Sequence, residues 1–319
     1  AACAAVTTEF ENVPAAALQR LAARVPVAPA AAAVAVCQDR AAEKAHFERS
    51  GVACAPHAVI NQAADLHAVP PALLPGILKT ARLGYDGKGQ QQVSDRAALA
   101  AAWQGLGAVP CVLEQRLALR HELSVIVARG ADGEVVELPV QQNLHRDGIL
   151  AVTEVPAPHI DDATRQQALE AARAIAASLD YVGVLCVEFF VTQDGRLLAN
   201  EMAPRPHNSG HYSIDACDVS QFELQLRCLA RLPLAAPRLH SAAVMLNLLG
   251  DLWFDAACAP REPPWPALLA LPGAHLHLYG KQQARHGRKM GHLTLTAADA
   301  TQARATALRA AGLLGIAAF

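Results

Sequence analysis

The sequence is short of aromatic residues, of net charge and of long apolar runs. Phenylalanine, tryptophan and tyrosine make up 4% of its 319 residues, which indicates compositional bias and not a function. The net charge of −2 gives no electrostatic case for binding to nucleic acid or to an acidic membrane surface. No uncharged apolar run approaches the roughly 20 residues that a membrane helix needs. A chain of 319 residues can hold two or three domains and bury sizeable cores.

Paired cysteine motifs are also absent. The 8 cysteines are scattered, none forms a C-x-x-C pair, and Cys111, Cys186 and Cys228 have apolar neighbours. This pattern favours reduced, buried thiols in a cytoplasmic protein over disulfides or a zinc site. The sequence has no initiator methionine and starts as if inside an element, so we expect the natural polypeptide to carry further N-terminal residues.

A glycine-rich segment at residues 84–90 is the most informative feature that is present. Gly84, Gly87 and Gly89 permit backbone conformations that a Cβ atom forbids, so successive N–H groups can form a concave anion site. Lys88 adds a charge suited to phosphate, and residues 73–79 are predicted to form a strand that ends in Lys79. The spacing of a Walker A loop is absent. The segment indicates either a nucleotide-binding flap or a flexible surface hairpin. A glycine-rich loop considered alone favours the hairpin.

The order of predicted elements is typical of an α/β protein built from α+β layers. Helical spacing and capping residues predict helices at residues 14–23, 39–50, 95–106, 161–178, 219–230 and 297–311. Apolar or alternating runs predict strands at residues 57–60, 73–79, 111–115, 122–128, 135–140, 181–192, 196–201, 243–248 and 274–279. Hairpins mixed with crossover helices favour layered sheets over one doubly wound sheet. The proline-bearing stretch 233–237 marks a predicted domain boundary.

The hairpin predicted around Asp194 and Gly195 brings two acidic residues together. If these two residues form a tight turn, Glu188 lies directly opposite Glu201 on the same face. Opposed like charges are costly unless a cation sits between them, and Mg²⁺ prefers oxygen ligands of this kind. Asn200 offers a further oxygen, although strand alternation turns it to the other face unless the strand bends. We therefore predict a metal site; the alternative is a pair of solvated glutamates.

Two more polar segments suggest anion binding. Arg205 lies between two prolines, which would hold its guanidinium against a phosphate or carboxylate, although a capped surface turn is an equal alternative. A basic cluster without an acid consists of Lys281, Arg285, Arg288 and Lys289. Because no aromatic residues are interleaved, capture of one ribose phosphate is favoured over a nucleic-acid surface. His275 and His277 share a strand face and are predicted to be structural, since we expect no third metal ligand nearby.

Together these segments resemble the family of 5-(carboxyamino)imidazole ribonucleotide synthase, an ATP-grasp enzyme of purine biosynthesis. The resemblance also includes residues 7–14 (TTEFENVP), 143–150 (NLHRDGIL) and 287–292 (GRKMGH), and so covers nearly the whole chain. It implies an ATP-grasp domain at residues 37–235, a small β-rich C-terminal domain at residues 236–319, and a truncated N-terminal Rossmann-like domain of which residues 1–36 are the remnant. It also implies a homodimer that uses ATP, Mg²⁺, bicarbonate and 5-aminoimidazole ribonucleotide.

The resemblance extends to individual residues. Those that correspond to ATP-binding positions are Arg40, Lys79, Gly84, Tyr85, Asp86, Gly87, Lys88, Gly89, Gln90, Glu114, Gln115, Arg116, Leu117, Glu122, His145, Asn200 and Glu201. Those that correspond to positions around the imidazole ribonucleotide are Glu9, Tyr85, Asp86, Lys88, Arg205, His207, Lys281, Arg288 and Lys289. Glu188 and Glu201 correspond to magnesium ligands. The catalytic candidates are Tyr85, Asp86, Arg205 and Lys289, with Asp86 as proton acceptor and Lys289 as its electrostatic partner.

The implied reaction uses ATP to join bicarbonate to the amine of the ribonucleotide, through carboxyphosphate. Two alternatives remain open. Another ATP-grasp carboxylate–amine ligase would keep ATP and both glutamates, but it would lack the Tyr85-Asp86 loop and the segment at residues 287–292. A catalytically impaired ATP-binding fragment is the second alternative, because the glycine-rich first turn of the Rossmann-like half is missing from the sequence.

Overall fold

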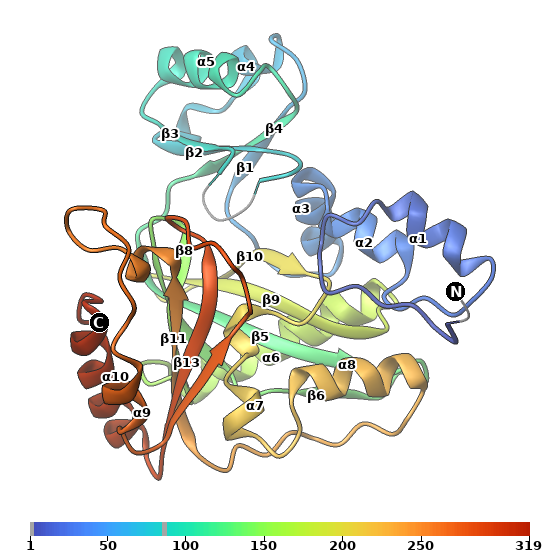
Figure 1. The fold of residues 1–319 in the computed structure, drawn as a ribbon. Coiled ribbons are helices and arrows are strands. Elements are labelled where there is room, and N and C mark those ends of the chain that lie inside the picture. The colour runs from blue at the N-terminus through green and yellow to red at the C-terminus, as the bar shows by residue number, and fades with distance from the viewer. Residues whose placement is uncertain (1–2, 85–87) are drawn as a thin grey trace.

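The fold combines two antiparallel sheets with helices packed on them. The structure is a computed structural model and describes residues 3–84 and 88–319. Figure 1 shows the smaller sheet, with its two helices, standing above a larger body built on the second sheet. The predicted α+β layers are therefore confirmed. Within the described residues, no helix is long and apolar enough to span a membrane.

Three helices occupy the N-terminal part: α1 (Ala15–Ala22), α2 (Ala31–Cys37) and α3 (Arg40–Arg49). The helices predicted at residues 14–23 and 39–50 are confirmed. Asp39 is the N-cap of α3, since its side chain accepts hydrogen bonds from the N–H groups of the next residues, and Gly51 ends it with φ +72°. Helix α2 was not predicted because its alanines and valines are apolar all round and give no amphipathic pattern.

The smaller sheet has four strands in the order β1 (His57–Ile60), β4 (Cys111–Gln115), β2 (Gly76–Thr80) and β3 (Gln90–Val93). Helices α4 (Asp65–Ala68) and α5 (Arg96–Gly105) accompany it, and Leu99 and Trp103 of α5 join the core of this unit. The strand predicted at residues 73–79 begins only at Gly76, because η1 (Pro71–Leu73) is a 3₁₀ turn. Strand β3 was not predicted because it consists mostly of exposed glutamines.

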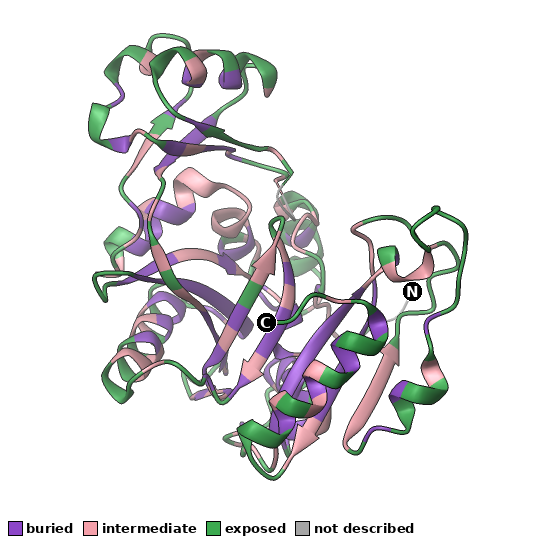
Figure 2. Ribbon diagram, turned by 90° about the vertical axis from the view of Figure 1, so that its left-hand side faces the viewer, coloured by how far each residue is buried: buried purple, intermediate pink, exposed green. Residues whose placement is uncertain are grey.

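The larger sheet has nine strands, and its central pair of strands is buried on both faces of the sheet. Strands β5 (Leu119–Arg129) and β9 (Gly183–Thr192) pair along their length. Their alternate residues pack on one side against α6 (Asp162–Ser178) and on the other against α8 (Gln221–Ala230). The remaining strands of this half are β10 (Leu197–Ala203), β6 (Val135–Glu137), β7 (Gln141–Arg146) and β8 (Ile149–Val155). Figure 2 shows the central strands buried and the outer helix faces exposed.

The same sheet continues through β11 (Ala242–Leu249), β13 (Lys289–Ala297) and β12 (Ala274–Leu278), past the predicted boundary at residues 233–237. Helix α10 (Ala300–Leu314) packs its alanine-rich face on β11 and β13. The short elements are α7 (Ser213–Ala216), α9 (Trp265–Leu269), η2 (Asn208–Gly210) and η3 (Gly250–Trp253). Strands β7, β8 and β13 were not predicted. The β7–β8 turn carried a usable signal, since Asp147 and Gly148 both have positive φ, as a tight Asp-Gly hairpin turn requires.

The cysteines are free thiols in this structure. Cys111, Cys186 and Cys228 are buried, as predicted. The prediction of burial does not extend to all of them, because Cys3 and Cys258 are exposed and Cys54 is half-buried.

Candidate active site

The two predicted metal ligands face each other across neighbouring strands. Glu188 of β9 pairs directly with Glu201 of β10, as predicted. The predicted two-residue turn is wrong, however, because Thr192 N–H donates to Arg196 O (3.0 Å) around a longer loop. If the register of residues 197–199 continued unchanged along β10, Asn200 and not Glu201 would lie opposite Glu188. A bulge between residues 199 and 201 shifts the register and restores the glutamate pair.

A guanidinium group and an imidazole ring flank this acid pair. Arg40 Nη1 lies 3.1 Å from Glu201 Oε2, and His207 Nε2 lies 3.5 Å from Glu188 Oε1. Burial and the charge on Glu201 raise the pKa of Glu188 to about 7. Burial would also raise the pKa of Glu201, but Arg40 and Lys79 outweigh it and lower that pKa. One carboxylate is therefore held ionised and the other resists ionisation, which is the asymmetry expected of two facing acids of which only one has a close cation.

The donor set of this pair suits Mg²⁺. Two carboxylates on adjacent strands supply the oxygen ligands that Mg²⁺ takes alongside phosphate oxygens and water. Within the described part of the chain, the side-chain oxygen of Asn200 is buried without a hydrogen-bond partner. The residues present therefore fit a magnesium site, with Asn200 as a further oxygen donor.

A buried cluster of two lysines and one glutamate connects the smaller sheet to the N-terminal helices. Glu114, near the end of β4, lies 2.8 Å from Lys79 Nζ of β2 and 3.2 Å from Lys44 Nζ of α3. Burial would raise the pKa of Glu114, but the two lysines outweigh it and lower that pKa to about 2. The sequence placed Lys79 and Glu114 together in the ATP site, whereas Lys44 was missed because spacing alone does not show which face of α3 is buried.

Several other predicted ATP residues lie around the junction of the two sheets. Residues 116–118 join β4 to β5, and Arg116 N–H donates to Pro75 O. On β5, Glu122 forms a close ion pair with His145 of β7. Burial alone would lower the pKa of His145, but the bond to Glu122 and the charges on the acid pair raise it to about 9. His145 is therefore a cation at neutral pH beside the acid pair.

The Glu122–His145 pair is expected to make the stability of the chain fall as the pH rises above neutrality. The pKa of His145 is about 9 in the folded chain and about 6.5 in an unfolded one. Because the folded value is higher, the contribution is complete below about pH 6.5 and is lost as the pH rises through about 9. Urea denaturation across this range should show the loss in the parent chain and in the exposed control His67→Gln, but not in His145→Gln. If the free energy of unfolding fell equally with pH in all three proteins, the loss would not arise from the Glu122–His145 pair.

The glycine-rich segment connects β2 to β3. Gly89 has φ +73°, and a Cβ there would lie 2.7 Å from Thr80 Oγ1, so the base of the loop requires glycine. Thr80 N–H donates to Gly89 O (2.8 Å). A strand follows the loop, which agrees with the absence of a Walker A motif. The catalytic candidates Tyr85 and Asp86, with Gly87, lie outside the described residues.

Two of the predicted substrate residues, His207 and Lys289, lie near the acid pair although they are far apart in the chain. Arg205, in the loop after β10, forms a close ion pair with Glu11, two residues beyond the exposed Glu9. Burial and the charges of Arg205 and Lys289 hold the pKa of His207 well below its usual range, so this imidazole is neutral. Lys281 Nζ donates to Lys289 O (2.5 Å) across the mouth of the β12–β13 hairpin.

The prediction that no third metal ligand lies near His277 is wrong. His292 of β13 pairs with His277 of β12, and Asp215 of α7 accepts a hydrogen bond from His277 Nε2 at 2.9 Å. The sequence could not show this, because α7 lies about sixty residues away from the hairpin. The two imidazoles stack face to face, with centroids 4.5 Å apart and an interplanar angle of 11°. Lone pairs in parallel ring planes do not converge on one ion, so this geometry favours a structural role for the cluster.

Comparison with known families identifies the class. Residues 45–222 match the ATP-grasp domain, and residues 1–38 match the ribonucleotide synthetase preATP-grasp domain. Residues 243–306 match the phosphoribosylaminoimidazole carboxylase C-terminal domain. The fold and the site thus define an ATP-grasp ligase.

Individual relatives narrow the assignment further. The N5-carboxyaminoimidazole ribonucleotide synthase of Brucella melitensis is 45% identical over 297 residues, which cover 92% of this chain and 79% of the relative. The synthase of Bacillus subtilis is 39% identical over 290 residues, which cover 91% of this chain and 74% of that relative. A crystal structure of the synthase from Aspergillus clavatus with ADP and 5-aminoimidazole ribonucleotide has a TM-score of 0.88 and 32% identity, over 98% and 82% of the two chains. The chain belongs to the N5-carboxyaminoimidazole ribonucleotide synthase family.

Proposed function

We propose that the chain carboxylates 5-aminoimidazole ribonucleotide with bicarbonate and ATP, and that the residues described above form its active site. The single observation that carries this proposal is the acid pair of Glu188 and Glu201, flanked by the cations Arg40 and His145. The family assignment supports the reaction, since a relative of this chain was crystallised with ADP and 5-aminoimidazole ribonucleotide.

The first step activates bicarbonate. A bicarbonate oxygen attacks the γ-phosphorus of ATP, the bond to the bridging oxygen of ADP breaks, and carboxyphosphate forms. Bound Mg²⁺ would supply charge neutralisation at the phosphate oxygens, held by Glu188, Glu201 and Asn200. Arg40, Lys79 and Lys88 would spread the remaining negative charge, while the end of β4 near Glu114 would hold adenine and Glu122 the ribose hydroxyls.

The second step forms the carbon–nitrogen bond. The amine nitrogen attacks the carboxyl carbon, the carbon–oxygen bond to phosphate breaks, and the nitrogen loses one proton. Asp86 would accept that proton, with Tyr85 beside it and Lys289 stabilising the carboxylate. Arg205, His207, Lys281 and Arg288 would hold the ribonucleotide phosphate and ring, with Glu9 nearby. Arg205 already binds a carboxylate, that of Glu11, which supports a role in holding an anionic group.

The proposal also covers the division of the chain into domains, its oligomeric state and its location in the cell. We propose three units, at residues 1–36, 37–235 and 236–319, which the family matches at residues 1–38, 45–222 and 243–306 support. The family resemblance also supports a homodimer in the cytoplasm.

ADP release is expected to depend on both bicarbonate and 5-aminoimidazole ribonucleotide, and a coupled assay measures it directly. Asp86→Asn should lower turnover by about 100-fold or more, because general base catalysis typically contributes this much. The exposed control Asp132→Asn, in the β5–β6 turn, should leave turnover unchanged. ATP binding without substrate-dependent ADP release would support the alternative of an impaired ATP-binding fragment. Full turnover in Asp86→Asn would exclude Asp86 as the essential acceptor and leave the overall reaction standing.

A further inference from the structure

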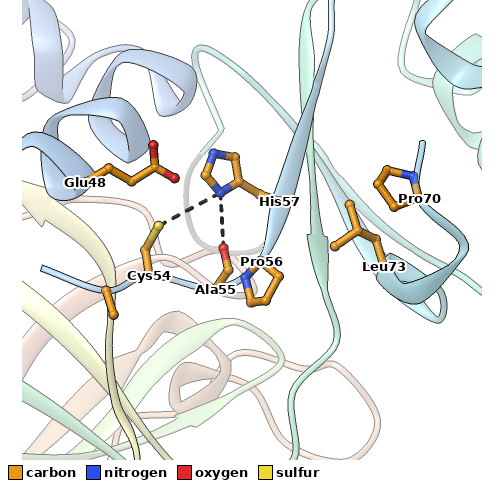
Figure 3. A pocket seen from close by; sticks show the side chains of 8 residues that line it. Glu48, Cys54, Ala55, Pro56, His57, Pro70 and Leu73 are labelled. Atoms are coloured by element: carbon orange, nitrogen blue, oxygen red, sulfur yellow. Dashed lines mark hydrogen bonds between the residues drawn. The ribbon is translucent and has the colours of Figure 1, made fainter. Parts of the chain in front are cut away.

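A cavity lies where the chain passes from α3 into β1. Its volume is about 460 Å³, and its lining includes Glu48 of α3, Cys54 of the connecting segment and His57 of β1 (Figure 3). This junction attaches the smaller sheet to the rest of the molecule, because β1 is the first strand of that sheet. None of the three residues takes part in the proposed reaction.

Three different ligand types converge in this cavity. A carboxylate oxygen of Glu48, the Sγ atom of Cys54 and a ring nitrogen of His57 all lie within 4.8 Å of one another. Cys54 Sγ is 3.9 Å from His57 Nδ1. The C-x-x-H spacing lets a short extended segment present both side chains to one point, as the paired ligands of many zinc sites do.

The histidine is already oriented as a ligand. Its Nδ1 lies 3.1 Å from the carbonyl oxygen of Ala55, and in the tautomer whose Nδ1–H donates there Nε2 keeps the lone pair for a metal ion. Metal-binding histidines are commonly fixed by such a bond from the other ring nitrogen to a backbone carbonyl. Figure 3 shows Nε2 directed toward the carboxylate of Glu48.

The local electrostatics favour a cation. The carboxylates of Glu48, Glu114 and Glu43 act on this position, and Lys44 opposes them. A surplus of negative charge of this kind attracts a metal ion. Within the described ranges 3–84 and 88–319, the carboxylate of Glu48 has no ion-pair partner, so it is available as a ligand.

We propose that Glu48, Cys54 and His57 bind a divalent transition-metal ion of the zinc class, at a site separate from the Glu188–Glu201 pair. The combination of sulfur, nitrogen and oxygen ligands selects Zn²⁺ or a similar ion over Mg²⁺, which prefers oxygen alone. Three protein ligands leave a fourth position open toward the cavity. The ion would connect α3 to the start of β1. The backbone of Cys54 also forms an isolated parallel β-bridge with Ala199 of β10. The site therefore adjoins the strand that carries Glu201.

Cobalt provides the test, because a thiolate bound to Co²⁺ gives an intense near-ultraviolet charge-transfer absorption. The full chain is titrated with Co²⁺ in the presence of excess Mg²⁺, which occupies the acid pair. We expect a saturable charge-transfer band that Zn²⁺ abolishes by displacement. Cys54→Ser should lose the band, and Glu48→Gln and His57→Gln should weaken Co²⁺ binding at least about tenfold. The matched control Cys258→Ser, at an exposed cysteine, should keep the band unchanged.

The result that overturns the proposal is equally direct. Absence of the band in the parent chain, or its persistence in Cys54→Ser, would show that these residues do not bind the metal. The Asp215, His277 and His292 cluster cannot produce a false signal, because it contains no sulfur. A second measurement covers any loss of folding in a variant. Zn²⁺ should raise the thermal midpoint of the parent chain and of Cys258→Ser but not that of Cys54→Ser, since a ligand that binds only the folded state stabilises it.

Discussion

Glu201→Gln is expected to reduce substrate-dependent ADP release by about 100-fold to 1000-fold, because it weakens the hold on the Mg²⁺ ion that stabilises the transferring phosphoryl group, and losing one electrostatic stabiliser of this kind costs about that much. The amide keeps the shape of the side chain but removes the charge that faces Glu188 and pairs with Arg40. Mg²⁺ held by one carboxylate instead of two should also require a higher concentration to saturate the enzyme. Steady-state rates measured across a Mg²⁺ titration test both effects.

Two variants make the measurement specific. Glu188→Gln should show the same loss, because both carboxylates are needed to hold the ion. Glu170→Gln is the matched control, since Glu170 is exposed on α6 and accepts a hydrogen bond from Gln166 within that helix. Retention of full activity by either acid-pair variant, at unchanged Mg²⁺ dependence, would refute the magnesium site and leave the ATP-grasp fold intact.

The sequence predicted the secondary structure best where local signals were strong. Asp39 and Gly51 bracket α3, and Asp161 begins α6, because capping is a short-range interaction that the sequence displays directly. Polar strands such as β3 and β7 were missed, since their residues mix exposed and buried positions without regular alternation. Alternation predicts strands only where one face is apolar.

The acid pair shows how a correct result can rest on an incorrect reason. Counting from a two-residue turn placed Glu188 opposite Glu201, but the real loop is longer and a bulge compensates for it. A bulge at Asn200 leaves no mark in a single sequence, because any residue can occupy one. The pairing was predictable; the local geometry that produces it was not.

Contacts between distant elements were the least predictable part of the site. The ion pairs of Glu114 with Lys44 and of Arg205 with Glu11 join residues that are far apart in the chain. No periodicity links such positions, so only the folded arrangement shows them. Resemblance to a family named the ligand-facing residues but did not show which of them neutralise one another in the protein itself.

Glu114→Gln is expected to lower the free energy of unfolding by about 3–5 kcal/mol, because it leaves two buried ammonium groups without their carboxylate. The side chain of Lys44 is fully buried, that of Glu114 is 3% exposed and that of Lys79 is 10% exposed, so water cannot replace the lost partner. The exposed helix pair of Glu223 and Arg227 is the contrast, and Glu223→Gln should cost at most about 0.5 kcal/mol. Urea denaturation at neutral pH compares the two variants.

The pH dependence gives an independent measure of the same cluster. The pKa of Glu114 is about 2 in the folded chain and about 4.3 in an unfolded one, so its contribution is complete above about pH 4.3 and is lost as the pH falls through about 2. The parent chain should therefore lose more stability than Glu114→Gln on acidification in that range. The double variant Lys44→Met with Glu114→Leu should recover part of the loss, since it removes a buried charge together with its partner. Equal stability of Glu114→Gln and the parent chain at neutral pH would mean that the lysines find other partners, and that this cluster does not fix the smaller sheet to α3.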